Sequence, residues 1–131
     1  IKNEYDGLHE NAQKYYFHDL DPWFEYNQNY YYYKIHDFPK LYAFLKTVPC
    51  VDHAMIAVME GSMSIPAHRA ESNLQLRYHL TLEGTSNLTT EFDIHQHKPG
   101  EDVLFDHARH HSVDKTGEEK RVVLILDINR F

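Results

Sequence analysis

Two histidines, each followed along the chain by an arginine, are the residues of this sequence best suited to chemistry. His68 precedes Arg77, and His111 precedes Arg121. Neutral imidazole is a good ligand for a redox-active divalent metal. The planar guanidinium group of an arginine can hold a carboxylate through two parallel hydrogen bonds. The order of these residues therefore indicates a metal site next to a binding site for a carboxylate.

The segment around Arg77 alternates between polar and apolar residues. Over residues 74–82 this alternation places Arg77, His79 and Thr81 on one face of a predicted strand and the apolar residues on the other. Burial of an unpaired polar group costs free energy, so we expect Arg77 and His79 to contact a ligand inside a barrel. Arg121 likewise opens an apolar segment. Taken singly, each arginine could be a charge at the end of a strand and each histidine a hydrogen-bonded core residue.

Other segments predict a mainly β domain. The tyrosine-rich residues 30–34 indicate an aromatic strand packed on the core, with a stacking platform for a substrate as the alternative. Residues 37–46 predict a short amphipathic helix that Asp37 caps, with Pro39 in its first turn. Further strands are predicted at 54–59, 88–97, 103–105 and 121–128, with a polar loop at 114–120. Short strands at this spacing predict an antiparallel sandwich or a small barrel.

Length, charge and cysteine content exclude several classes of protein. The 131 residues fit one domain, and no apolar run is long enough to span a membrane. A net charge of -7 without a lysine or arginine cluster argues against binding of nucleic acid. Cys50 is the only cysteine and has no surroundings typical of a nucleophile. It favours a reducing compartment such as the cytoplasm, while the sequon that begins at Asn87 keeps the secretory pathway open.

Residues 38–131 resemble the aspartyl/asparaginyl β-hydroxylase family of iron- and 2-oxoglutarate-dependent oxygenases, which also includes lipid-hydroxylase-like bacterial members. The first matching motif is His68 followed by Arg77-Tyr78-His79-Leu80. The second runs from Leu104-Phe105-Asp106 through His111 to Arg121 and Asp127. The resemblance implies a double-stranded β-helix (a cupin-like jelly roll) with one or two short N-terminal helices. We expect a single domain, made of an aromatic-rich segment (1–36) and a family-like core (37–131).

The resemblance also implies a role for each site residue. His68 and His111 would bind Fe(II), and Arg121 would hold the distal carboxylate of 2-oxoglutarate. Arg77 and His79 would contact the same cosubstrate. With molecular oxygen, the protein would hydroxylate an aspartyl or asparaginyl side chain of a polypeptide. A free or carrier-bound amino acid or a lipid is the alternative substrate. A metal-binding cupin-like module without turnover and a degenerate interaction domain are the non-enzymatic alternatives.

Two positions depart from the pattern of related enzymes. Many iron- and 2-oxoglutarate-dependent enzymes have a carboxylate ligand two residues after the first histidine, where this chain has Ala70. Glu71, one residue further, would point away from His68 in an extended segment. The resemblance implies that water fills the position, as in aspartyl hydroxylases, with chloride as the alternative. Ala57 stands where the family often has a serine near the cosubstrate.

Three further histidines could compete with this site. His95 and His97 form an H-x-H pair that would share one face of a strand and could bind a metal at the surface. They come directly before the turn sequence Lys98-Pro99-Gly100, so we expect them to be exposed turn residues. His110 adjoins the proposed ligand His111, and we expect it to face solvent or to support that ligand.

Overall fold

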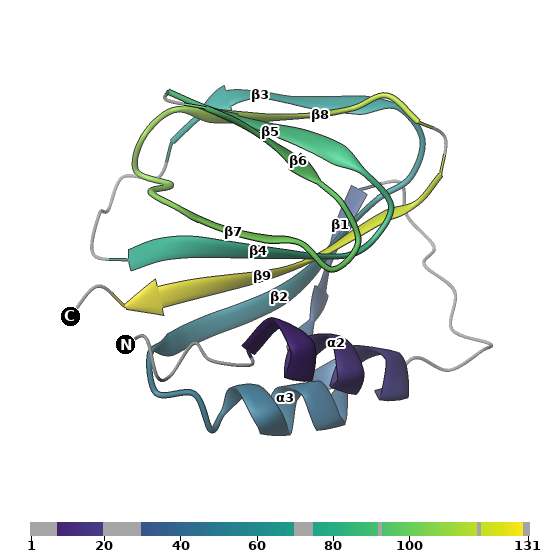
Figure 1. Cartoon of the computed structure of the whole chain (residues 1–131), viewed down its shortest axis with the longest axis vertical. Helices are drawn as coiled ribbons and strands as arrows, with labels where there is room; N and C mark the ends of the chain where they lie inside the picture. The colour runs from purple at the N-terminus through teal and green to yellow at the C-terminus, as the bar shows by residue number, and fades with distance from the viewer. Residues whose placement is uncertain (1–7, 20–29, 70–74, 92, 118, 130–131) are drawn as a thin grey trace.

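Two antiparallel sheets face one another, and two helices pack on the outer side of the larger sheet (Figure 1). The computed structural model describes residues 8–19, 30–69, 75–91, 93–117 and 119–129. The larger sheet has the strand order β1 (Tyr30–Lys34), β2 (Val51–Met59), β9 (Arg121–Asn129), β4 (Gln75–Glu83) and β7 (Asp102–Phe105). The smaller sheet has the order β3 (Met63–His68), β8 (His111–Lys115), β5 (Ser86–Thr90) and β6 (Ile94–His97). This jelly roll confirms the predicted fold class.

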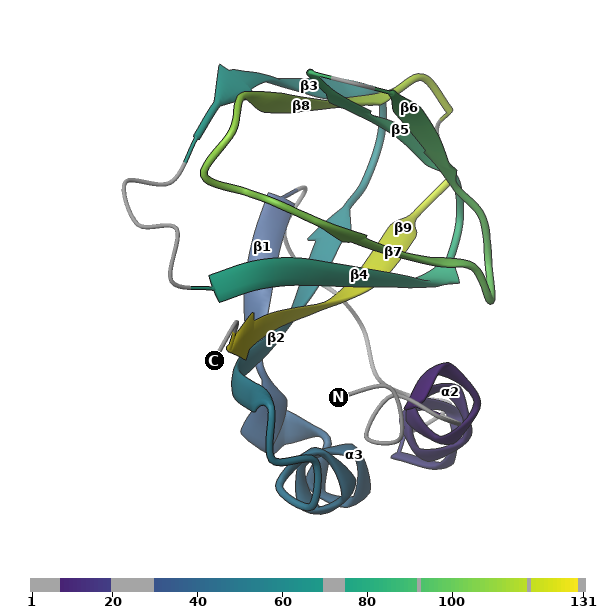
Figure 2. The same ribbon diagram turned by 60° about the vertical axis from the view of Figure 1, so that its left-hand side comes forward.

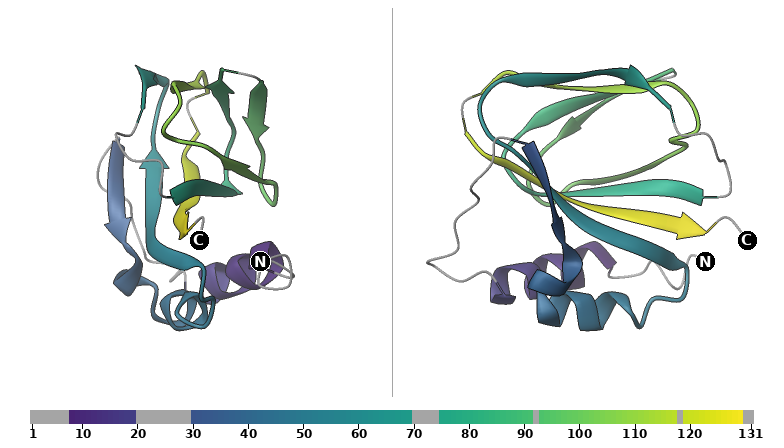
Figure 3. Two further views of the ribbon diagram at one scale, coloured as in Figure 1. Left: turned by 90° about the vertical axis from the view of Figure 1, so that its left-hand side faces the viewer. Right: turned by 180° about the vertical axis from the view of Figure 1, so that it is seen from behind.

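The larger sheet lies between the two helices and the smaller sheet (Figure 2). In β4, Tyr78, Leu80 and Leu82 are buried in the core that the helices cover. Arg77 and His79 line a cavity between the two sheets. The predicted alternation of β4 is therefore confirmed, because its apolar face supports the helices and its polar face looks into the roll. The side and rear views in Figure 3 show the same separation between the helices and the smaller sheet.

The helix α3 (Pro39–Leu45) begins differently from the prediction. Asp37 does not cap it, because this residue ends a short 3-10 turn, η1 (Ile35–Asp37), and the residue at the N-cap is Phe38. A side chain from elsewhere satisfies one of the first backbone N–H groups: Leu41 donates to Oδ2 of Asp19 at 2.8 Å. The first helix thus stabilises the start of the second.

The helix α2 (Leu8–Asp19) lies in the N-terminal segment for which the sequence located no helix. Its buried side chains are Leu8, Ala12 and Tyr16, which follow one another at four-residue intervals and form one stripe. The hydroxyl group of Tyr16 donates to a carboxylate oxygen of Glu83 at 2.6 Å, which ties the helix to the end of β4. No helix in the described ranges is long and apolar enough to cross a membrane.

Two predicted boundaries in the second half of the chain are wrong. Residues 88–97 are not one strand but the hairpin of β5 and β6, because Thr90 donates from its N–H to the carbonyl of Asp93 and accepts from the N–H of Asp93 at its Oγ1. The predicted loop 114–120 begins later, since β8 extends to Lys115. Lys115 is 2% exposed and donates to the carbonyl oxygens of Gly61 and Gly117, which compensates for burial of its charge.

The turn between β4 and β5 requires a glycine. Gly84 has a φ of +75°, in the left-handed region that residues with a Cβ rarely adopt. A Cβ at this position would lie 2.3 Å from the carbonyl oxygen of Lys120 and 2.7 Å from Cα of Arg121. The turn therefore packs directly on the backbone at the start of β9 and holds Arg121 at the edge of the cavity.

Candidate active site

A small cavity of about 40 Å³ lies between the two sheets. Its lining comes from β1, β2, β3, β4, β8 and β9, and consists of Tyr32, Ala57, Met59, Ile65, Arg77, His79, His111, Val113, Arg121 and Ile125. The structure thus brings together four of the five residues that the sequence predicted for the site. Tyr32 joins the predicted aromatic strand to the cavity, and Ala57 lies in its wall as the resemblance implied. The volume suits a carboxylate-sized group.

His111 is held in a defined orientation at the start of β8. It is 6% exposed, and its Nδ1 lies 2.9 Å from the backbone carbonyl oxygen of Arg109. A carbonyl oxygen only accepts, so Nδ1 must carry the proton and Nε2 must carry the lone pair of a neutral ring. A hydrogen bond of this kind is how proteins fix a histidine that binds a metal through its other nitrogen. His111 therefore has the orientation and tautomer that a metal ligand needs.

The two arginines of the cavity have different surroundings. Arg121 is 3% exposed and donates from a terminal nitrogen to Oγ of Ser86 at 3.3 Å. Arg77 is half-buried and forms an ion pair with Asp127, with Nε and the second terminal nitrogen each 3.1 Å from Oδ1. The acidic partner that Arg77 lacks in its own strand is thus supplied by β9, directly opposite in the sheet. Both guanidinium groups lie in the wall of the same cavity, but the charge of Arg77 is balanced by Asp127.

His79 has a partner that the sequence analysis did not assign to the site. Its Nδ1 lies 3.2 Å from Nε2 of His97, and Nδ1 of His97 lies 2.6 Å from Oγ of Ser86. The prediction that His97 is an exposed turn residue is wrong, because its exposed fraction is 0%. His97 ends β6, where the roll folds it inward before the turn at Lys98 begins. The signal that could have indicated a buried His97 was strand alternation, since it places His97 and His95 on the same face of β6.

Both rings of this pair are neutral at physiological pH. Burial, followed by the positive charge of Arg121 and an electrostatic interaction with His95, lowers the pKa of His97 to about 3. Burial also lowers the pKa of His79 well below its ordinary value, and His97, Arg121, Arg77 and His111 lower it further. Two neutral imidazoles in contact must each donate through one nitrogen and accept through the other.

The first proposed metal ligand is described only through its backbone. His68 ends β3 and is paired with His111, after a register shift between Ile65 and His68. The side chain of His68 and the positions of Ala70 and Glu71 lie outside the described residues. Within the described part of the chain, no three metal-binding side chains form a cluster. The pairing nevertheless brings the backbones of the two histidines named from sequence side by side.

The remaining candidates from the sequence do not join this cavity. His110 is exposed, as predicted, whereas Cys50 is buried in the core under the helices. His95 is half-buried and lies 5.5 Å from His97 between ring centroids, so the pair is not an exposed surface site.

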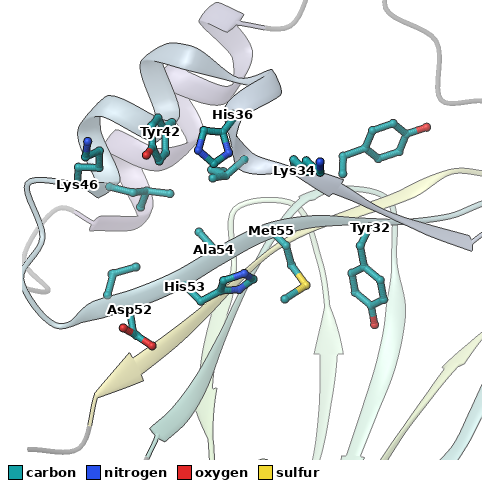
Figure 4. A pocket seen from close by; sticks show the side chains of 13 residues that line it. Tyr32, Lys34, His36, Tyr42, Lys46, Asp52, His53, Ala54 and Met55 are labelled. Carbon is teal, nitrogen blue, oxygen red and sulfur yellow. The ribbon is translucent and has the colours of Figure 1, made fainter.

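Two larger depressions lie outside this cavity. One, of about 390 Å³, is lined by Leu88, Ile94, Val103, Leu104 and Phe105, with a rim of polar residues that includes the ion pair between Arg109 and Glu91. The Phe105 ring is 4.9 Å from the His79 ring and 5.2 Å from the His111 ring between centroids, so it borders both spaces. The other, of about 840 Å³, lies between η1, α3 and β2 (Figure 4). Its labelled side chains include Lys34, His36 and Lys46, none of which lines the cavity.

The fold is that of cupin-like double-stranded β-helix proteins. An RmlC-like cupin protein from Desulfovibrio desulfuricans is similar with a TM-score of 0.57 and 10% identity, covering 83% of this chain and 94% of that chain. The Cnp3 cupin domain of Schizosaccharomyces pombe is similar with a TM-score of 0.52 and 14% identity, covering 59% of this chain and 55% of that chain. At such low identity, these similarities establish the fold alone.

The chain belongs to the aspartyl/asparaginyl beta-hydroxylase family, whose model matches residues 2–130. This confirms the resemblance that the two histidine motifs indicated. An ornithine lipid ester-linked acyl 2-hydroxylase of Rhizobium tropici is 31% identical over 94 residues, which cover 68% of this chain and 34% of that protein. The chain thus spans about a third of the length of this curated relative. Family and relative together identify the chain as a hydroxylase homologue.

Proposed function

We propose that this protein is an Fe(II)- and 2-oxoglutarate-dependent hydroxylase with its active site in the cavity between the two sheets. The observation that carries the proposal is the convergence of Arg77, His79 and Arg121 beside His111, in a chain of the hydroxylase family. The reaction would consume oxygen, 2-oxoglutarate and a substrate C–H bond. One oxygen atom would enter the new hydroxyl group and the other the succinate, with carbon dioxide as the third product.

The chemistry of the two histidines suits an iron site. His111 presents the lone pair of Nε2 because its Nδ1 donates to a carbonyl oxygen, and His68 is its partner in the ladder. These two histidines would hold the metal, with water at the position that Ala70 leaves without a carboxylate. Bound iron would supply the activation of oxygen. The residues around it would position the cosubstrate and exclude bulk water.

The cosubstrate would be recognised through its charge. Arg121 is buried and would place its planar guanidinium group against the distal carboxylate of 2-oxoglutarate. The charge of Arg77 is balanced by Asp127. Arg77 would therefore donate to the cosubstrate through one side of its guanidinium group and would not supply an unpaired charge. A neutral His79 would donate one further hydrogen bond. A five-carbon dicarboxylate needs more room than the present cavity gives, so binding would require side chains such as Met59 or Tyr32 to move.

Two substrate classes follow from different observations. The family model favours an aspartyl or asparaginyl side chain of a polypeptide. The Rhizobium relative favours the acyl chain of a lipid, and the apolar depression next to Phe105 supports this second candidate. Ile94 is 64% exposed and Leu104 is 44% exposed there, so an apolar ligand would cover surface that is now in contact with water.

The test begins with anaerobic addition of Fe(II) and 2-oxoglutarate to the protein. We expect a weak visible charge-transfer band, and succinate formation after oxygen is admitted. Peptides that contain Asp or Asn and vesicles that contain an acylated ornithine lipid would then be screened for a mass gain of one oxygen atom. The control is His111→Ala, which should show neither the band nor succinate. Absence of both from the wild-type protein would refute the proposal and favour a non-catalytic module.

A further inference from the structure

Behind the proposed cosubstrate site, four side chains form a continuous chain of polar contacts. It runs from Arg121 to Ser86 over 3.3 Å, from Ser86 to His97 over 2.6 Å and from His97 to His79 over 3.2 Å. Ser86 is 5% exposed and His97 is 0% exposed. The hydrogen bonds bring together β9, β5, β6 and β4, and they join the two sheets. Neither Ser86 nor His97 lines the cavity itself.

Hydrogen bonds can run along these four side chains in two directions, and only one direction uses the hydroxyl hydrogen of Ser86. Arginine can only donate, so Oγ of Ser86 accepts from Arg121. The hydroxyl hydrogen of Ser86 is then available to Nδ1 of His97. A neutral His97 that accepts at Nδ1 must carry its proton on Nε2 and donate to Nδ1 of His79. His79 must in turn carry its proton on Nε2.

The opposite arrangement would change what the cavity offers to a ligand. If His79 donated from Nδ1 and His97 donated to Ser86, Nε2 of His79 would carry a lone pair. A lone pair would repel a carboxylate oxygen, whereas an Nε2–H group would donate to it. Nε2 of His79 has no hydrogen-bond partner among the described residues and belongs to a residue of the cavity wall. Between two guanidinium groups, the donor form suits an anionic ligand.

We propose that Ser86 and His97 are positioning residues that lock His79 in its Nε2–H tautomer, so that Arg121 and His79 present matched donors to one carboxylate. This inference rests on the proposed function only for the identity of the carboxylate. The tautomer of His79 does not depend on that function. These hydrogen-bonded side chains act as a unit, because a change of tautomer at His97 forces the same change at His79. The low pKa of both rings agrees with this neutral arrangement.

The direct test is long-range proton–nitrogen NMR of the uniformly nitrogen-15-labelled, metal-free protein at neutral pH. The spectra report which nitrogen of each histidine carries the proton, and the variants His79→Gln and His97→Gln assign the two signals. We expect both His79 and His97 to be Nε2–H tautomers. An Nδ1–H tautomer at His79 would overturn the inference whether or not the protein turns over 2-oxoglutarate. This result is therefore separable from failure of the proposed function.

The second test is the substitution Ser86→Ala, which removes the hydroxyl group at the centre of the chain. We expect His79 to lose its single tautomer and the KM for 2-oxoglutarate to rise about tenfold, with kcat changed by less than about twofold. Ser86→Thr keeps the hydroxyl group and should restore both readouts. The matched control is Thr81→Val, because it removes a fully buried hydroxyl group two residues from His79 that has no hydrogen-bond partner among the described residues. Equal KM values for Ser86→Ala and Thr81→Val would refute the positioning role.

Discussion

His97 should make the folded protein sensitive to acid. Its pKa in the folded protein is about 3, against an ordinary value of 6.5 that also applies to the unfolded chain. Above the ordinary value neither state binds the proton, so His97 has no effect on the free energy of unfolding. Below it, the unfolded state takes up a proton that the folded state refuses, and stability falls with decreasing pH down to the folded pKa.

The size of this effect follows from the two pKa values. Each pH unit inside the window costs about 1.4 kcal/mol, so acidification from pH 7 to pH 5 should remove about 2 kcal/mol through His97 alone. In His97→Gln this part of the loss is absent, because an amide does not titrate. His79 is present in both proteins and contributes to both losses. The wild type should therefore lose about 2 kcal/mol more than the variant over this pH range.

Urea unfolding of the metal-free proteins at both pH values measures this difference. The variant itself should be less stable at pH 7, since Ser86 and His79 each lose a buried partner. For this reason, the comparison uses only the change in the free energy of unfolding between the two pH values. His110→Gln removes an exposed histidine and serves as the control for loss of an imidazole. If the wild type and His97→Gln lost equal amounts of unfolding free energy, His97 would be accessible to protons. This result would refute the buried hydrogen bonds between Ser86, His97 and His79.

Four further substitutions test the site and its support. His68→Ala and His111→Ala should each abolish Fe(II) binding, measured by equilibrium dialysis, while circular dichroism shows that the sheets persist; retained binding would refute the ligand assignment. Arg121→Lys should raise the 2-oxoglutarate concentration needed for half-maximal succinate formation by more than about tenfold, because an ammonium group cannot replace a planar fork. Gly84→Ala should lower the free energy of unfolding by more than about 2 kcal/mol, because of its left-handed backbone and the close carbonyl oxygen. Its matched control, Gly117→Ala, meets only a flexible side chain no nearer than 3.7 Å and should change stability little.

Much of the roll could be predicted from the sequence, because alternation of polar and apolar residues predicts strands. The period of two along β4 placed Arg77 and His79 inside, and the structure confirms this. The helix α3 was equally visible through its apolar spacing and Pro39. These signals are local, since each depends on residues within one element.

The features that the sequence did not predict depend on contacts between distant residues. His97 and His79 are 18 positions apart, and only the folding of β6 over the roll makes one the partner of the other. The stripe of Leu8, Ala12 and Tyr16 in α2 has one small member and is surrounded by polar and aromatic residues, which weakens its helical pattern. The partner of Arg77 was missed because Asp127 lies 50 positions later. Burial and charge balance at these residues are properties of the tertiary structure.

The position of β9 has a consequence for synthesis of the protein. This strand is the last one described, yet it lies between β2 and β4 in the middle of the larger sheet. While residues 121–129 are still being made, β2 and β4 each expose an unpaired edge that no other described strand of the sheet covers on that side. The larger sheet therefore cannot form during synthesis until β9 has been made, and the nascent chain needs protection from aggregation until then. Because the same strand brings Arg121 into the roll, the carboxylate binding that we propose would be possible only in a molecule whose larger sheet is complete.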